Sequence, residues 1–110
     1  MSQYKSIKPN YAIATGDTNL ESIPVYGENN ICTVEMNGLN SSDASVELHQ
    51  SIDNNTWGLV PDSPKVLSIG QTSHTWNVRG LVSGAYLRVA VKKGTATAGT
   101  ITAVKLLSNV

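Results

Sequence analysis

The sequence lacks phenylalanine, contains one cysteine, and has no excess of either charge: Lys and Arg together number 8, as do Asp and Glu. A lone cysteine, Cys32, excludes an intramolecular disulfide and therefore the disulfide framework of many small secreted domains. A formal net charge of zero leaves no long-range field to attract nucleic acid or anionic lipid. We therefore expect neither nucleic acid nor a membrane among the partners.

The sequence also has no long hydrophobic run. No stretch approaches the roughly 18 consecutive apolar residues of a membrane-spanning helix, and residues 1–5 lack the apolar segment of a secretory signal. We expect a chain that is neither exported through such a signal nor inserted into a membrane. Its cysteine usage favours assembly in a reducing cytoplasm.

Small polar and aliphatic residues dominate instead. Ser, Thr and Asn make up 32 of the 110 residues, and Val, Ile and Leu make up 27, in a chain of 11.7 kDa. The length suits a single domain, and short runs with a period of two alternate with turn-forming clusters. The sequence predicts an all-β fold, a single antiparallel β-sandwich of immunoglobulin-like or jelly-roll type, over residues 23–110.

Three segments show the alternation most clearly. Residues 31–36 place Cys32, Val34 and Met36 on one face, which we expect to be buried. Two further strands are predicted over 44–53 and 85–93, with the inward residues Ala44, Val46, Leu48 and Ile52, and Ala85, Leu87, Val89 and Val91. The last predicted strand, 100–107, is apolar on both faces, so its inward face is left open.

Residues 1–22 hold neither a helical nor a strand period for long. We interpret them as an extended N-terminal arm that contacts a neighbouring subunit, with Tyr4, Ile7, Tyr11 and Ile13 as its candidate contact residues. The alternative is that the segment covers the domain's own sheet or frays, as chain termini often do.

Candidates for catalysis are sparse. Glu35 and Glu47 are outward-facing carboxylates that form an acid/base pair only if their strands bring them about 5 Å apart, and we interpret them as charged groups of a solvated face. The lone Cys32 has no neighbouring charge in sequence that would activate its thiol. No nucleophile elbow or phosphate-binding glycine motif occurs, so we do not expect an enzyme.

Metal and cofactor sites have no matching pattern either. His49, His74 and Cys32 follow no ligand spacing typical of zinc sites. Four aspartates fall in predicted loops but form no calcium-loop series: Asp17, Asp43, Asp53 and Asp62. We therefore expect no metal and no cofactor.

The aromatic residues leave two interpretations open. An exposed Trp57 or Trp76 would offer a flat platform for a sugar. Because the sequence has no phenylalanine to fill the core, we favour both indoles as core residues. Tyr86 and Arg88 share a predicted polar face, and we count them as candidate interaction residues.

Several segments together resemble a known family. The segment 45–57 (SVELHQSIDNNTW), the strand 86–89 (YLRV) and the ending 94–103 (GTATAGTITA) are similar to small β-sandwich virion proteins of tailed bacteriophages, in which such pieces recur in head-decoration, head-fibre and tail-associated modules. The resemblance spans about residues 31–107. Ile52 and the pair Asn55-Thr56 stand where the family often has Asn and Gly.

This resemblance implies a non-enzymatic structural role in the virion after assembly in the host cytoplasm. The expected function is that of an auxiliary or decoration protein on the outside of the capsid, which stabilises it or displays a surface. The expected partners are the major capsid protein, other virion proteins and further copies of this chain. The alternative function is a tail- or fibre-associated carbohydrate-binding module for host attachment.

Overall fold

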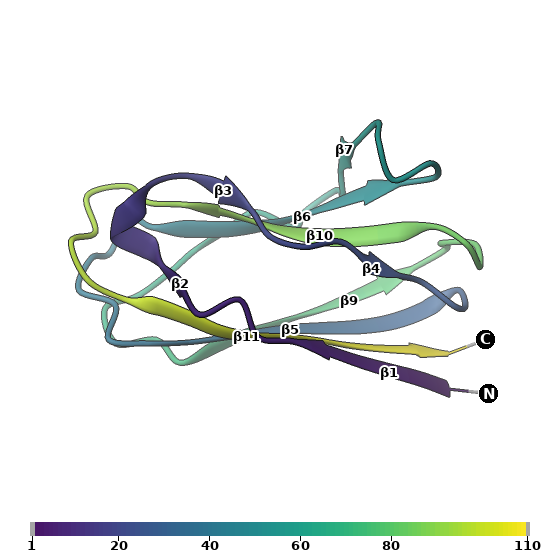
Figure 1. The fold of residues 1–110 in the computed structure, drawn as a ribbon, viewed down its shortest axis with the longest axis horizontal. Coiled ribbons are helices and arrows are strands. Elements are labelled where there is room, and N and C mark those ends of the chain that lie inside the picture. Colours follow the sequence, from purple (N-terminus) through teal and green to yellow (C-terminus); the bar gives the residue numbers. More distant parts are fainter. Residues whose placement is uncertain (1, 110) are drawn as a thin grey trace.

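A computed structural model describes residues 2–109 as two antiparallel β-sheets packed face to face (Figure 1). Sheet A contains β1 (Ser2–Ile7), β2 (Tyr11–Ala12), β5 (Asn29–Asn37), β9 (Ser73–Arg79) and β11 (Thr100–Asn109). Sheet B contains β3 (Thr18–Asn19), β4 (Ile23–Pro24), β6 (Ser45–Ser51), β7 (Gly58–Leu59), β8 (Lys65–Val66) and β10 (Tyr86–Lys92). The predicted all-β antiparallel sandwich is confirmed.

Each sheet is organised around one long strand. In sheet A, β11 pairs with β1 and β2 along one side and with β5 along the other, and β5 pairs with β9. In sheet B, β10 pairs with β3 and β4 along one side and with β6 along the other, and β6 pairs with β7 and β8. In the described part of the chain, the one helical element is a single 3-10 turn, Ile13–Thr15, and no helix is long and apolar enough to cross a membrane.

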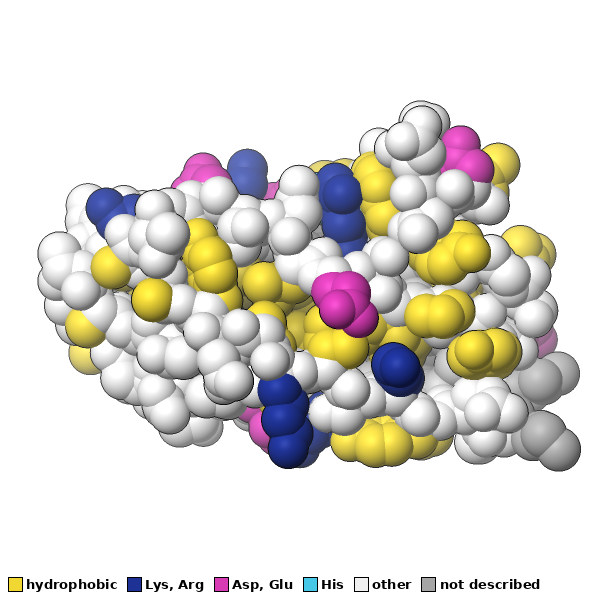
Figure 2. Space-filling model, viewed as in Figure 1, with side chains coloured by type: hydrophobic (Ala, Val, Ile, Leu, Met, Phe, Trp, Pro, Cys, Tyr) yellow, Lys and Arg dark blue, Asp and Glu magenta, His cyan; other side chains and the backbone are white. Residues whose placement is uncertain are grey.

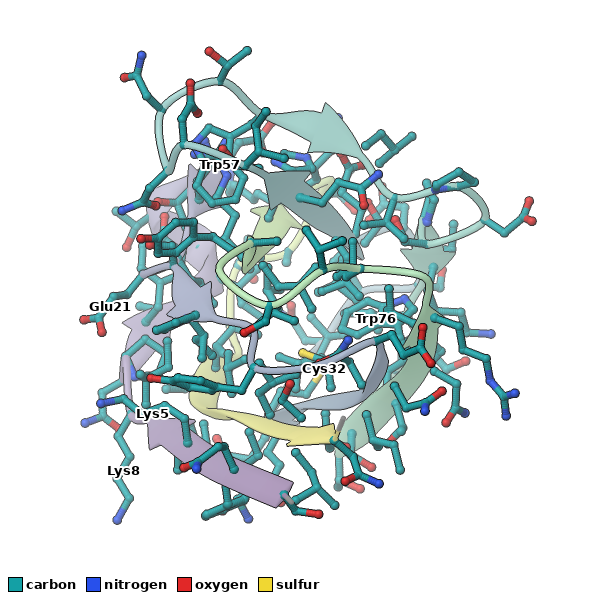
Figure 3. The ribbon with its side chains drawn as sticks, turned by 90° about the vertical axis from the view of Figure 1, so that its right-hand side faces the viewer. Lys5, Lys8, Glu21, Cys32, Trp57 and Trp76 are labelled. Carbon is teal, nitrogen blue, oxygen red and sulfur yellow. The ribbon has the colours of Figure 1, made fainter. Side chains whose placement is uncertain are left out.

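The core lies between the sheets and follows the predicted alternation. The core contains Cys32, Val34 and Met36 from β5, Leu87, Val89 and Val91 from β10, and Ala85 just before β10, and all seven are buried. Figure 3 looks along the strands and shows Cys32 and Trp76 in the space between the sheets. Burial raises the pKa of the Cys32 thiol to about 12, so the thiol is neutral and unreactive at physiological pH.

The prediction that Ile52 faces the core is wrong. Ile52 is 84% exposed, because β6 ends at Ser51 and a turn begins there. The turn is held by Asp53, whose Oδ1 accepts hydrogen bonds from the backbone N–H groups of Asn55 and Thr56. The alternation of β6 therefore stops one position before Ile52.

A β-bulge in β11 explains why both faces of the last predicted strand are apolar. The register between β11 and β5 shifts between Ile101 and Ala103, and an extra residue at such a point exchanges the inward and outward faces. Ile101 is buried before the shift, and Val104 and Leu106 are buried after it. Both apolar faces of the sequence are thus used, one on each side of the bulge.

The extended arm predicted for residues 1–22 is corrected by the structure. β1 pairs with β11 over six residues, from Ser2↔Asn109 to Ile7↔Val104, and Ile13 and Leu20 are buried in the core. The described part of this segment therefore belongs to both sheets of its own chain, as the alternative interpretation held. The physical reason is that β11 offers a long edge for pairing, while burial of the two aliphatic side chains removes apolar surface from water.

Candidate functional site

The outer face of sheet B carries a connected group of polar side chains. On β6, Glu47 Oε2 lies 2.8 Å from His49 Nε2. On β10, the Nε–H of Arg88 donates to His49 Nδ1 at 3.1 Å, and Lys92 Nζ lies 3.9 Å from Glu47 Oε1. Strand pairing sets these contacts, because Arg88 is directly opposite His49 in the register of the two strands.

Trp57 extends this group from the neighbouring hairpin. The guanidinium carbon of Arg88 lies 4.2 Å from the centre of the Trp57 ring, which is the geometry of a cation–π contact. Trp57 is half-buried at the outer side of sheet B (Figure 3), so its prediction as a core residue is wrong. Partial burial lowers the pKa of Arg88, yet arginine stays charged at any physiological pH.

Trp76 behaves as predicted. Its ring is buried between the sheets, and its indole N–H donates to the backbone carbonyl of Ser63 at 2.8 Å. The His74 ring meets it edge-on, with 4.7 Å between ring centres. The pKa of His74 is lowered mainly by burial and, to a smaller extent, by the nearby positive charge of Lys65.

A hydrogen-bonded turn places Trp57. Asp53 Oδ1 accepts from the Ser51 hydroxyl at 2.9 Å and from the backbone N–H groups of Asn55 and Thr56 at 2.9 and 2.8 Å. These bonds to the ionised form lower the pKa of Asp53 to about 2, with the Thr56 N–H as the largest cause. The chain then returns through β7, which pairs with β6 at His49↔Leu59, and this return brings the indole over sheet B.

A groove of about 260 Å³ lies beside the polar group, between β3 and β6. The groove opens over Ala90, a small residue on the outward side of β10. Ala90 is paired with Glu47 on one side and with Asn19 on the other. The lining of the groove consists of Asp17, Thr18, Asn19, Glu47, His49, Ala90, Val91 and Lys92. With hydroxyl, amide, carboxylate, imidazole and ammonium groups side by side, the groove is suited to binding a polar ligand through hydrogen bonds.

The two candidate acid/base residues are on opposite sides of the molecule. Glu47 is on the outer face of sheet B, whereas Glu35 is on the outer face of sheet A, 2.9 Å from Lys105 Nζ. Since the two packed sheets separate these faces by about 10 Å or more, the two carboxyl groups cannot flank one scissile bond. The hydrogen bond and charge of Glu35 raise the pKa of Lys105.

The candidate metal ligands are separated as well. His49 is on the outer face of sheet B, while Cys32 and His74 are on strands of sheet A. Among the described residues, no group of three or more His, Cys, Asp or Glu side chains is placed to hold a metal ion. Three loop aspartates bind backbone N–H groups instead: Asp17 that of Lys93, Asp43 that of Thr95, and Asp53 those described above.

The predicted interaction residues do not form one surface. Ile13 is fully buried, so it is a core residue and not a contact residue. Ile7 and Tyr11 are half-buried against the core, and the Tyr11 hydroxyl donates to the carbonyl of Gly16. Tyr4 is exposed on sheet A, whereas Tyr86 and Arg88 share the outer face of sheet B.

The sequence predicted which residues of β6 and β10 face outward, but it did not predict that they contact one another. The alternation of β6 already placed Glu47 and His49 outward, and that of β10 placed Arg88 outward. The missing information was the register between the two strands and the return of the hairpin that carries Trp57. No local signal in the sequence indicates that His49 and Arg88, which are 39 residues apart, lie opposite each other.

Comparison with known proteins shows the fold. No protein-family model matches the chain, and no curated protein matches its sequence. Among solved structures, it is similar to the SPBc2 prophage-derived protein YomS, with a TM-score of 0.57, 14% identity, and coverage of 97% of this chain and 93% of that one. It is also similar to the xylan-binding module CBM15, with a TM-score of 0.50, 13% identity, and coverage of 96% and 90%. The Eiger TNF of S. frugiperda matches with a TM-score of 0.52 and 13% identity over 80% of this chain and 62% of that one.

The two tryptophans should differ in their contribution to stability. Trp76→Ala opens a cavity in the core and is expected to lower the free energy of unfolding by about 3–5 kcal/mol. Trp57→Ala removes a half-buried ring and one cation–π contact, and we expect a loss of about 1–2 kcal/mol. Urea unfolding of both variants measures the difference. Equal losses in the free energy of unfolding would contradict the peripheral position assigned to Trp57.

The turn at Asp53 should make stability depend on pH in acid. Its folded pKa of about 2 lies below the usual value of 3.8, so its stabilisation is present above about pH 4 and is lost as the pH falls through 2. Asp53→Asn keeps an acceptor oxygen but no titrating charge. The difference between the unfolding midpoints of wild type and variant should therefore shrink from pH 5 to pH 2. A difference that stays constant over this range would contradict the assignment.

Proposed function

We propose that this chain is a non-enzymatic structural protein of a tailed-bacteriophage particle, an auxiliary protein on the outside of the capsid that stabilises it or displays a surface. The observation that carries the proposal is the likeness in fold to a prophage-derived protein over nearly the full length of both chains. The motifs at 45–57, 86–89 and 94–103 support the same assignment. Its partners are then the major capsid protein, other virion proteins and further copies of the chain.

The surface suits repeated contacts with protein. Nine large hydrophobic side chains are exposed among the described residues, and the view in Figure 2 shows apolar patches separated by single charged side chains over β1, β3 and β4. Such patches with a polar surround are typical of protein contact surfaces. The formal charge of zero lets many copies lie close together without mutual repulsion.

Purified particles test this proposal. We expect mass spectrometry to find the chain in particles of the phage or prophage that encodes it, and cryo-electron microscopy to place it in many copies on the outer capsid surface. A particle that lacks the chain would overturn the structural role. A position confined to the tail would overturn the capsid assignment while keeping the chain in the virion.

A carbohydrate-binding role in host attachment is the second candidate, and the outer face of sheet B favours it. Trp57 keeps part of its indole exposed beside Arg88, and the adjacent groove presents hydrogen-bonding groups from Asn19, Glu47 and His49. An apolar ring next to a few directed polar groups is the usual composition of a sugar site. The likeness to a xylan-binding module shows that this type of sandwich also serves such proteins.

A glycan array separates this role from a purely structural one. If the face binds sugar, Trp57→Ala and Arg88→Ala should each weaken the signal at least tenfold while the circular dichroism spectrum stays that of wild type. Tyr26→Ala, which removes an exposed aromatic side chain outside the groove, is the matched control and should bind normally. Absence of binding to any glycan, or equal binding by all variants, would reject the site.

A further inference from the structure

Three of the exposed hydrophobic side chains form an apolar row on the outer face of sheet A. Tyr4 on β1 is paired with Leu107 on β11, and Leu107 is paired with Ile31 on β5. These side chains lie side by side across three strands and are 62%, 40% and 45% exposed. A contiguous exposed apolar row on one sheet face is typical of a contact surface and not of a solvated one.

A hollow opens next to this row. It has a volume of about 350 Å³. Two of its lining side chains, Ile31 and Leu107, belong to the row, and the others are polar: Ser2, Asn29, Asn30, Asn77, Arg79 and Asn109. Tyr4 does not line the hollow; it stands on the edge strand, two strands away from Ile31. The same face therefore holds a protruding aromatic ring and an amide-rimmed depression with an apolar part.

We propose that this face binds the same face of a second copy of the chain, with Tyr4 of each copy seated over Ile31 and the hollow of the other. Adjacent strands are about 4.8 Å apart, so Tyr4 and Ile31 are separated by about 10 Å across β11. A two-fold axis that runs along β11 exchanges the positions of β1 and β5. Each ring then lies over the other copy's hollow, as an isologous interface requires.

Other two-fold arrangements do not achieve this. An axis across the strands would leave Tyr4 over β1 of the second copy, away from the hollow. The axis along β11 also puts Arg79, on the far edge strand β9, beyond the β1 edge of the second copy, where its charge stays in water. Lys105 lies near the axis, but Glu35 matches its charge at 2.9 Å. No unpaired charge on this face is then buried.

The size of the face indicates a weak dimer. The three strands that overlap, β1, β11 and β5, at about 4.8 Å each and eight residues at about 3.4 Å give roughly 400 Å² per copy, or about 800 Å² in total. That total is the size of a weak, transient interface, and we expect a dissociation constant in the high micromolar range. Dimerisation is a property of the purified chain, so its test does not depend on whether the chain is found in a particle.

Sedimentation equilibrium over a concentration series tests the dimer. We expect the weight-average mass to rise with concentration from that of the 11.7 kDa chain toward twice that value. Ile31→Lys, and independently the milder Tyr4→Ser on the edge strand, should weaken association at least tenfold with the circular dichroism spectrum unchanged. Ile69→Lys, at an equally apolar position that is 67% exposed between β8 and β9, is the control and should dimerise as wild type does.

Cross-linking tests the predicted orientation. Sheets packed face to face are about 10 Å apart, so a bismaleimide of that length should link a Tyr4→Cys chain to an Ile31→Cys chain when the two are mixed. Each variant alone should link far less, and the native Cys32 is buried and unreactive. The proposal would be overturned if the chain stayed monomeric at millimolar concentration, or if neither Ile31→Lys nor Tyr4→Ser weakened the dimer. Equal cross-linking in the mixture and in each variant alone would overturn it as well.

Discussion

The pairing of β11 is the constraint on which the rest of the structure depends. This ten-residue strand joins β1 and β2 on one side to β5 on the other, and the bulge after Ile101 lets it bury apolar residues of both alternation phases. Without β11, the N-terminal strand would have no partner, and the inner face of sheet A would lose Val104 and Leu106. The strand nearest the C-terminus therefore determines where the N-terminus lies.

This pairing also gives the molecule two distinct outer faces. Sheet B presents charged and hydrogen-bonding groups linked through Glu47, His49 and Arg88, with Trp57 at their end. Sheet A presents the row of Tyr4, Leu107 and Ile31, which exists only because β1 is paired with β11. The division allows one face to bind a polar ligand while the other binds a further copy, since the core separates them.

The strands β5, β6 and β10 could be predicted from the sequence, because burial of one face requires apolar residues at alternate positions. Residues 2–7 do not show this alternation. β1 is an edge strand whose inward positions include Lys5, so pairing holds it more than burial does. Trp57 was misplaced for a related reason: whether an indole is buried depends on where its hairpin returns, which a linear sequence does not contain.

Hydrogen exchange of the backbone amides measures the pairing of β1 with β11 directly. Alternate amides within Ser2–Ile7 that bond to β11 should exchange at least a hundredfold more slowly than in an unstructured peptide, while those that face away exchange quickly. A pattern of alternating protection would establish that the N-terminal segment is a strand of sheet A. Uniformly fast exchange over residues 2–7 would mean a free arm, and would remove both the Tyr4 row and the face built on it.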